Sequence, residues 1–245
     1  MGHEFELPQE ATVEATPEEV WEAISTGPGI DSWFMGRNEV ADGVVRTVFG
    51  GFALPESTVT ASEPGGRFAH TSGRADDGRF VAYEFLVEGR GRGSTVLRMV
   101  TSGFLPGDDW ETEYEAMSNG LAMFFATLVE YLTHFAGRVA TPVTEFSPKI
   151  EDWPDAWRRL RGELGQPSEG DRVRFAPAGL APIEGVVYFT NAQALGVRTA
   201  DALYRFLQGR DGSMVAAHHL FSGGGFSGGG DQGRAWRAWL DQVFG

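Results

Sequence analysis

The chain has 245 residues, of which 42% are hydrophobic, and it carries a formal net charge of −14. This length and composition predict a sizeable core, in one large domain or in one medium and one small domain. A general nucleic-acid-binding protein needs a basic face to neutralise phosphates, so the acidic balance argues against that class. The sequence contains no cysteine, which excludes disulfides, thiolate nucleophiles and cysteine-ligated metals.

The first ten residues, MGHEFELPQE, have neither the basic start nor the apolar run of a signal peptide. No apolar run in the sequence approaches the length of a membrane span. We therefore expect a cytoplasmic protein that has no membrane partner.

The first predicted helix opens with a capping box. Thr16 stands at the N-cap position, a proline follows it, and Glu19 completes the S/T-x-x-E pattern. The Gly-Pro-Gly of residues 27–29 is expected to end this helix. A second short helix or turn then carries Trp33 and Phe34.

Short β-like runs lie on both sides of that helix. Before it, residues 5–15 predict a strand that is interrupted at Pro8. After it, turn residues separate five runs that predict strands over residues 43–49, 57–66, 67–73, 79–89 and 94–104. The connections are too short for helical crossovers, which favours an antiparallel meander.

The fourth of these five runs alternates most clearly between apolar and polar positions. Val81, Tyr83, Phe85 and Val87 share one face, and Glu84 lies on the other. We expect the first face to point into the protein and Glu84 to face solvent.

The strongest signal in the sequence is a long amphipathic pattern over residues 108–137. Apolar residues recur there at helical spacing, at Tyr114, Met117, Leu121, Phe124, Phe125, Leu128, Tyr131, Leu132 and Phe135. Gly137 supplies a C-terminal stop. The helix should have about 25 residues and a length of roughly 40 Å at 1.5 Å per residue. Its apolar stripe requires a wide partner, and a curved antiparallel sheet is the obvious one.

The remainder of the chain, residues 139–245, has a different pattern. The Pro-rich segment 140–157 reads as a linker that enters a helix, and this helix is predicted over residues 154–164. Residues 185–190, 201–209 and 213–223 predict strands, and residues 234–244 predict a closing helix with Trp236 and Trp239 on one face. We therefore predict an α+β protein with one domain at residues 1–138 and a smaller α+β region at residues 139–245.

The segment ATVEATPEEVWEAISTGPGIDSWF, residues 11–34, resembles the opening of the START-like (SRPBCC, helix-grip) superfamily. It is most similar to the branch named after the activator of the Hsp90 ATPase, in which a strand is followed by a P-x-x-V-W-x-A-[IL] helix and a W-F segment. The matching positions are Pro17, Val20, Trp21, Ala23, Ile24, Trp33 and Phe34. The long helix also resembles the closing helix of that superfamily, so the resemblance covers about residues 5–138. For residues 139–245 we expect a truncated relative of the same fold.

The resemblance implies a helix-grip fold, in which a curved antiparallel sheet wraps around the long C-terminal helix. It also implies a cavity for an apolar ligand between helix and sheet, with Trp33 and Phe34 near its mouth. Such sites are mostly apolar and contain a few polar groups. The ligand-binding candidates are Trp33, Phe34, Phe49, Phe68, His70, Tyr83, Phe85, Met99, Met117, Leu121 and Phe124.

Catalysis has few candidates in this sequence. His70 and Tyr83 are candidate proton-transfer residues, because an imidazole can act as an acid or base near neutral pH. The alternative for His70 is a hydrogen-bonded strand histidine. The pair His218 and His219 could place one ring on each side of a strand. The sequence has no metal-binding spacing of the H-E-x-x-H type, and we expect neither a metal nor a cofactor.

The glycine-rich segment SGGGFSGGGDQG, residues 222–233, invites a phosphate-loop interpretation because a helix follows it. The pattern G-x-x-x-x-G-K-[ST] is absent, and Asp231 adds negative charge where a phosphate would bind. A flexible loop is expected instead. Phe226 within it would anchor the loop or cover a pocket.

The leading functional hypothesis is a START-like protein that binds a small hydrophobic molecule and has no catalytic activity of its own. The first alternative is an enzyme of the polyketide cyclase/dehydratase type. The second is a co-chaperone-like module that binds another protein. The three differ in what they predict for the interior: a closed apolar cavity, converging polar groups, or a filled core with an exposed apolar patch.

Overall fold

The computed structural model describes residues 2–91, 93–108, 110–221 and 228–245. The chain divides into two compact units, Met1–Val139 and Ala140–Gly245, whereas the sequence analysis set the boundary after residue 138. Both units combine helices with an antiparallel sheet. Among the described residues, no helix is both long enough and apolar enough to cross a membrane.

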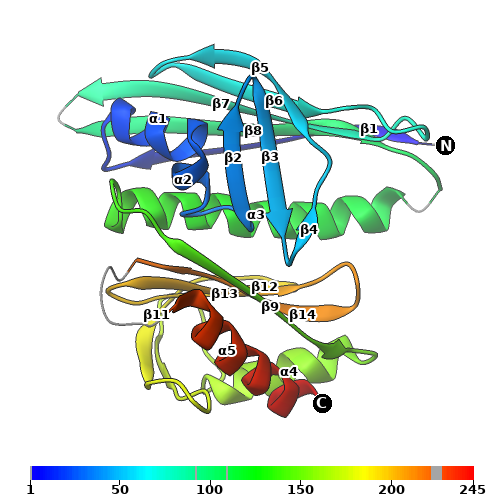
Figure 1. Ribbon diagram of the computed structural model, residues 1–245, viewed down its shortest axis with the longest axis vertical. Coiled ribbons are helices and arrows are strands. Elements are labelled where there is room, and N and C mark those ends of the chain that lie inside the picture. Colours follow the sequence, from blue (N-terminus) through cyan, green and yellow to red (C-terminus); the bar gives the residue numbers. More distant parts are fainter. Residues whose placement is uncertain (1, 92, 109, 222–227) are drawn as a thin grey trace. The chain divides into compact units, whose positions relative to one another are not determined.

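In its described residues, the first unit contains one large antiparallel sheet and three helices (Figure 1). The sheet order is β1-β8-β7-β6-β5-β3-β2, and the short strand β4 pairs with β3. The elements of this unit are β1 His3–Val13, α1 Pro17–Ser25, α2 Gly27–Ile30, β2 Arg37–Ala41, β3 Val44–Phe49, β4 Phe52–Ala53, β5 Ser57–Glu63, β6 Arg67–Ser72, β7 Phe80–Gly91, β8 Ser94–Leu105 and α3 Trp110–His134.

The capping box of α1 is confirmed. The backbone N–H of Glu19 donates to Thr16 Oγ1 at 3.2 Å, and the backbone N–H of Thr16 donates to Glu19 Oε2 at 2.8 Å. The two bonds satisfy donors that the first turn of a helix leaves without partners. The helix then buries Val20, Ala23 and Ile24.

The first helix ends before the Gly-Pro-Gly segment, as predicted, and the second short helix begins within that segment instead of after it. Residues 27–29 open α2, and Thr26 caps it by accepting the N–H of Gly29 at 3.0 Å. A Cβ atom at Gly29 would lie 2.0 Å from the carbonyl oxygen of Glu22, so only glycine allows this close approach to α1. Trp33 and Phe34 follow α2 in a turn.

The strand β1 is continuous through Pro8, so the predicted interruption is wrong. Pro8 pairs in register with Val100 of β8, and β1 forms the edge of the sheet. Proline lacks a backbone N–H, and an edge strand tolerates that loss on its unpaired side.

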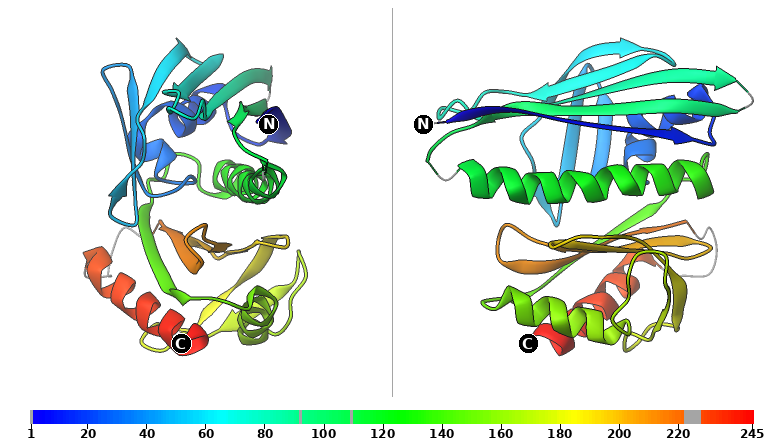
Figure 2. Two further views of the ribbon diagram at one scale, coloured as in Figure 1. Left: turned by 90° about the vertical axis from the view of Figure 1, so that its right-hand side faces the viewer. Right: turned by 180° about the vertical axis from the view of Figure 1, so that it is seen from behind.

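One face of this sheet carries the buried side chains, and we call it the inner face. Along β8 every second residue is buried: Thr95, Leu97, Met99, Thr101, Gly103 and Leu105. The 25-residue helix α3, as long as predicted, contacts β1 and β8 (Figures 1 and 2). His3 stacks on Trp110 with ring centroids 4.1 Å apart, and Phe5 meets Tyr114 at 6.0 Å.

The second unit has a six-stranded antiparallel sheet in the order β10-β11-β12-β13-β14-β9. Its helices α4 and α5 contribute Trp157, Leu160, Trp236, Trp239 and Leu240 to a core shared with the strands. The predicted apolar face of the closing helix is therefore confirmed. The elements are β9 Thr141–Lys149, α4 Trp153–Glu163, β10 Arg172–Phe175, β11 Ile183–Thr190, β12 Ala194–Arg198, β13 Ala202–Gln208, β14 Ser213–Leu220 and α5 Gly228–Phe244.

The two units share one order of connections. In each unit the first strand pairs with the last strand, a helix follows the first strand, and the remaining strands run as a meander. In each unit a helix also follows the last strand.

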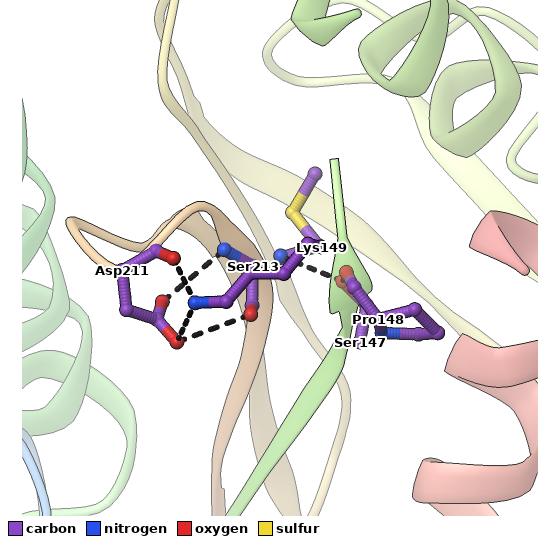
Figure 3. A network of polar contacts seen from close by, with 6 residues as sticks. Ser147, Pro148, Lys149, Asp211 and Ser213 are labelled. Carbon is purple, nitrogen blue, oxygen red and sulfur yellow. Dashed lines mark hydrogen bonds and ion pairs between the residues drawn. The ribbon is translucent and has the colours of Figure 1, made fainter. Parts of the chain in front are cut away.

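The segment 140–157 contains a strand, β9, so its interpretation as a linker is wrong. A polar network where β9 meets β14 helps to fix the strand there (Figure 3). Lys149 Nζ lies 3.1 Å from Asp211 Oδ2, and the same carboxylate accepts bonds from the backbone N–H and hydroxyl of Ser213. Met214 follows Ser213 in the chain, and its backbone N–H donates to Ser147 Oγ on β9 at 2.9 Å. The prolines of this segment obscured its strand character in the sequence.

Replacement of Thr16 by alanine should destabilise the protein by about 1 kcal/mol, because the first turn of α1 loses the hydroxyl that accepts the Glu19 N–H. Chemical denaturation measures the free energy of unfolding of this variant. Thr60→Ala, an exposed position on β5, is the control and should change stability by at most about 0.5 kcal/mol. Equal effects of the two substitutions would contradict the role given to the cap.

Candidate functional site

Two rows of side chains cross the inner face of the first sheet. In one row, Thr101 on β8 pairs with Tyr83 on β7, and Tyr83 pairs with His70 on β6. In the adjacent row, Met99 pairs with Phe85, and Phe85 pairs with Phe68. Paired residues on neighbouring strands point to the same face of a sheet. The register therefore brings five predicted site residues together: Phe68, His70, Tyr83, Phe85 and Met99.

Aromatic rings connect this face to helix α3. Phe124 on α3 lies 4.8 Å from Phe34, ring centroid to ring centroid, and Phe34 meets Tyr83 edge-on at 5.9 Å. Tyr83 stacks on His70 at 5.1 Å with an interplanar angle of 27°, and His70 lies 5.8 Å from Phe68. We call these five residues the aromatic line. Phe34 comes from the turn after α2, so four separate segments build the line: that turn, α3, β7 and β6.

Trp33 and Phe34 have different roles although they are adjacent in the chain. Trp33 is 2% exposed, and its indole N–H donates to the carbonyl of Ala23 at 2.9 Å. Its ring contacts Phe34 at 5.2 Å and Phe85 at 6.0 Å. Trp33 is thus a buried residue that supports the aromatic line, and Phe34, which is half-buried, belongs to the line itself.

The three remaining candidates lie elsewhere. Met117, which is half-buried, and Leu121, which is 5% exposed, lie on α3 within the two turns that precede Phe124. Phe49 lies on β3 and pairs with Phe52 in the β3–β4 hairpin. In the sheet order β3 is separated from β7 by two strands, so the register does not bring Phe49 into the two rows.

Three polar atoms on the inner face are buried without a hydrogen-bond partner in the described part of the chain. They are His70 Nδ1, Thr101 Oγ1 and Gln9 Oε1, and a fourth such atom, Ser118 Oγ, lies on α3. Gln9 pairs in register with Met99, so it extends the second row onto β1.

Buried polar groups are normally paired, and an unpaired one costs about 1–3 kcal/mol. The three atoms therefore mark places where a water or a bound molecule can donate or accept. The sequence analysis missed Gln9, Thr101 and Ser118. A signal existed for Thr101, because it is a polar residue at an inward position of a strongly alternating strand.

Burial keeps both titratable side chains of the aromatic line uncharged near neutral pH. It lowers the pKa of the His70 imidazole to about 4 and raises the pKa of the Tyr83 hydroxyl to about 12. Glu84 lies on the opposite face, as the alternation predicted, where its Oε1 accepts from Arg67 Nε at 2.7 Å. The two rows therefore offer hydrogen bonds and apolar surface without a formal charge.

The described residues contain no group of three histidine, aspartate or glutamate side chains arranged to hold a metal ion. Of the glycine-rich segment 222–233, residues 222–227, including Phe226, lie outside the described residues. From Gly228 onward the segment belongs to helix α5, so the expected flexible loop is wrong for that part.

No family model matches the chain, and no curated protein matches it. Several solved structures are similar to it. The Aha1 dimer from Colwellia psychrerythraea is 19% identical, and the match covers 52% of this chain and 96% of that one with a TM-score of 0.43.

Two further structures match nearly the whole chain. The di-domain ARO/CYC BexL from the BE-7585A biosynthetic pathway is 12% identical, with 98% of each chain covered and a TM-score of 0.45. DynU16, a protein in the dynemicin biosynthetic locus, is 18% identical, with 98% of this chain and 95% of that chain covered and a TM-score of 0.43. All three structures have TM-scores below 0.5, and nothing about family, ligands or activity is transferred from them.

Protonation of His70 should reduce stability between about pH 6.5 and pH 4, since its pKa is near 6.5 when unfolded and about 4 when folded. In that window the unfolded state binds more protons, so stability rises with pH and is lost as pH falls. His70→Gln removes this titration. The difference in unfolding free energy between wild type and variant should therefore change by at most about 1.4 kcal/mol per pH unit there, and should be constant above it.

Urea denaturation at several pH values measures that difference. The second variant, His70→Phe, also lacks a titrating group and should give the same pH slope relative to wild type, whatever its offset. Parallel stability curves for wild type and both variants between pH 4 and 6.5 would contradict the buried, neutral His70.

Proposed function

We propose that the first unit is a START-like helix-grip domain that binds a small hydrophobic molecule between α3 and the inner face of the sheet. In this proposal the sheet wraps around α3, and the unit has no catalytic activity of its own. The observation that carries the proposal is the aromatic line together with the unpaired polar atoms beside it. A fully packed core would bury apolar groups alone or pair its polar ones.

The character of the ligand follows from the groups that face it. The aromatic line offers apolar and π surface, which favours a ligand with an aromatic or otherwise flat apolar body. His70 on β6 and Thr101 on β8 flank Tyr83 on β7, and each pairs with it. Their unpaired atoms, His70 Nδ1 and Thr101 Oγ1, therefore favour polar groups at separate points of the ligand. The chain's net charge of −14 disfavours the approach of anions. The ligand class is therefore a neutral, mostly apolar molecule with a few oxygen or nitrogen atoms.

The enzyme alternative rests on His70 and Tyr83, which are stacked and both uncharged near neutral pH. His70 would accept a proton at Nδ1, and Tyr83 would donate one from its hydroxyl. General acid–base catalysis is most efficient when the pKa of the group lies near the working pH. Values of about 4 and about 12 are far from that range. This comparison favours binding over catalysis for the protein as it stands.

The protein-binding alternative predicted an exposed apolar patch. The β3–β4 hairpin exposes Val48 by 46% and Phe52 by 74%, and Leu54 follows them at 36%. These three exposed side chains form a smaller group than the five residues of the aromatic line. The protein-binding function therefore has less support than ligand binding, and the binding experiment below separates the two functions.

For residues 140–245 we propose a truncated second START-like unit. The support is the shared order of connections: a first strand paired with the last, an intervening helix, a meander and a closing helix. Unit two has one helix, α4, where unit one has α1 and α2 between the first two strands.

Met117→Trp should weaken binding of N-phenyl-1-naphthylamine, a neutral probe whose fluorescence rises in apolar sites. The larger side chain would occupy space next to Leu121 and Phe124 on α3, and we expect the Kd to rise about tenfold, equivalent to ~1.4 kcal/mol. The melting temperature should stay close to that of the wild type, because the new ring fills space that the ligand otherwise occupies.

Leu86→Trp is the matched control, since Leu86 is 36% exposed on the opposite face of β7 and the substitution adds the same ring outside the site. It should leave probe binding unchanged. If Met117 lies in a filled core, Met117→Trp should instead destabilise the protein by about 1–3 kcal/mol. That loss would contradict the proposed function if the variant also binds the probe as well as the wild type does, or if the wild type does not bind the probe.

A further inference from the structure

The second unit contains a pocket of about 350 Å³ beside the turn that joins β12 to β13. This volume lies toward the lower end of the range that is usual for small-molecule sites. The walls come from residues 180–182, the start of β11, the β12–β13 turn, β13 and the first half of α5. Neither the sequence analysis nor the proposed function uses this pocket.

One wall of the pocket is formed by Tyr204, whose ring is held in place by core residues. Its centroid lies 5.1 Å from that of the His218 ring and 5.6 Å from that of the Trp236 ring. Tyr204 remains half-buried and lines the pocket, and Leu180 and Ile183 add apolar surface beside it. A ligand therefore meets a preformed wall that is partly aromatic and partly aliphatic.

The charged part of the lining is acidic. Asp201 and Glu184 line the pocket, and none of its described lining residues is lysine, arginine or histidine. Thr199 Oγ1 donates to Asp201 Oδ1 at 2.9 Å and orients this carboxylate, whereas Asp201 Oδ2 has no hydrogen bond or ion pair within the described part of the chain. Glu184 Oε1 instead lies 3.1 Å from Arg174 Nε, which balances its charge. Asp201 is therefore the carboxylate that is available to a ligand.

The pKa of Tyr204 indicates that the Asp201 carboxylate lies near the ring. Burial raises this pKa first and the negative charge of Asp201 raises it further, to about 12. The phenol therefore keeps its proton near neutral pH and adds no second negative charge. A ligand cation beside Asp201 would also lie near an aromatic ring, whose π face attracts positive charge.

We propose that this pocket binds a small organic amine in its protonated form, with the ammonium group at Asp201 and an apolar body against Tyr204 and Leu180. An ammonium group supplies positive charge and three hydrogen-bond donors, and the carboxylate supplies the acceptors. The net charge of −14 favours the approach of a cation over that of an anion. This site lies in the second unit and does not depend on the function proposed for the first.

Two simpler possibilities make different predictions. If the pocket holds only solvent, a cation acts through the overall negative charge, and removing one exposed carboxylate anywhere in the unit has the same small effect. If the pocket recognises apolar shape alone, a neutral molecule of the same shape binds as well as the amine. Matched ligands and matched variants separate both possibilities from a specific amine site.

The test is a titration of the ¹⁵N-labelled full chain with benzylamine, observed at the backbone amide signals of Ala200, Asp201 and Tyr204. We expect these signals to shift and to saturate at millimolar benzylamine. Benzyl alcohol has the same apolar body without the charge, and benzoate has the opposite charge, so both should bind at least about fivefold more weakly. Sodium chloride should weaken the binding of benzylamine, because salt screens the attraction.

Asp201→Asn removes the charge but keeps an oxygen that can accept from the Thr199 hydroxyl, so the turn should be retained. The Kd for benzylamine should rise about fivefold, the upper end for an exposed ion pair. Glu169→Gln is the matched control, because it removes one exposed charge of the same unit outside the pocket, and it should leave the Kd unchanged. The proposal is overturned if benzylamine shifts none of the three signals, if benzyl alcohol binds equally well, or if the two substitutions have equal effects.

Discussion

The antiparallel pairing of β1 with β8 is the constraint on which the first unit depends. It places the first strand beside the strand that leads into α3, so the helix returns along the face that both strands share. The contacts of His3 with Trp110 and of Phe5 with Tyr114 follow from this pairing. A slip of one residue would turn every inward side chain of β1 toward solvent, Gln9 among them. The register thus determines which groups a ligand meets.

The inner face combines stabilising and costly features. Trp33, Phe68, Phe85 and Met99 are almost fully buried and stabilise the unit through the apolar area they remove from water. The unpaired Thr101 and His70 work against that stability, and packing would improve if they were apolar. Buried polar side chains that lower stability in this way are expected at functional sites. In the second unit, His218 Nε2 and Trp236 Nε1 are likewise buried without a hydrogen-bond partner among the described residues.

Local patterns predicted those elements whose signals lie within one segment. The α1 capping box, the length of α3, the inward parity of Tyr83 and Phe85, and the Trp236 and Trp239 face of α5 could all be deduced from spacing alone. The strand β9 and the unbroken β1 could not, because their prolines suggest breaks and their partners, β14 and β8, are far away in the sequence. The unpaired atoms of Thr101 and Gln9 depend on cross-strand register and burial, which no single segment reveals.

Native mass spectrometry of the freshly purified full chain, compared with its denatured mass, tests the central claim most directly. The account predicts a reproducible excess over the 26.6 kDa chain that disappears on denaturation, caused by a non-covalently bound molecule. The released compound should be neutral and mostly apolar, with a few oxygen or nitrogen atoms, to match the aromatic line and the polar atoms beside it. A native mass equal to that of the chain alone, or a released compound that is anionic and strongly polar, would contradict the account.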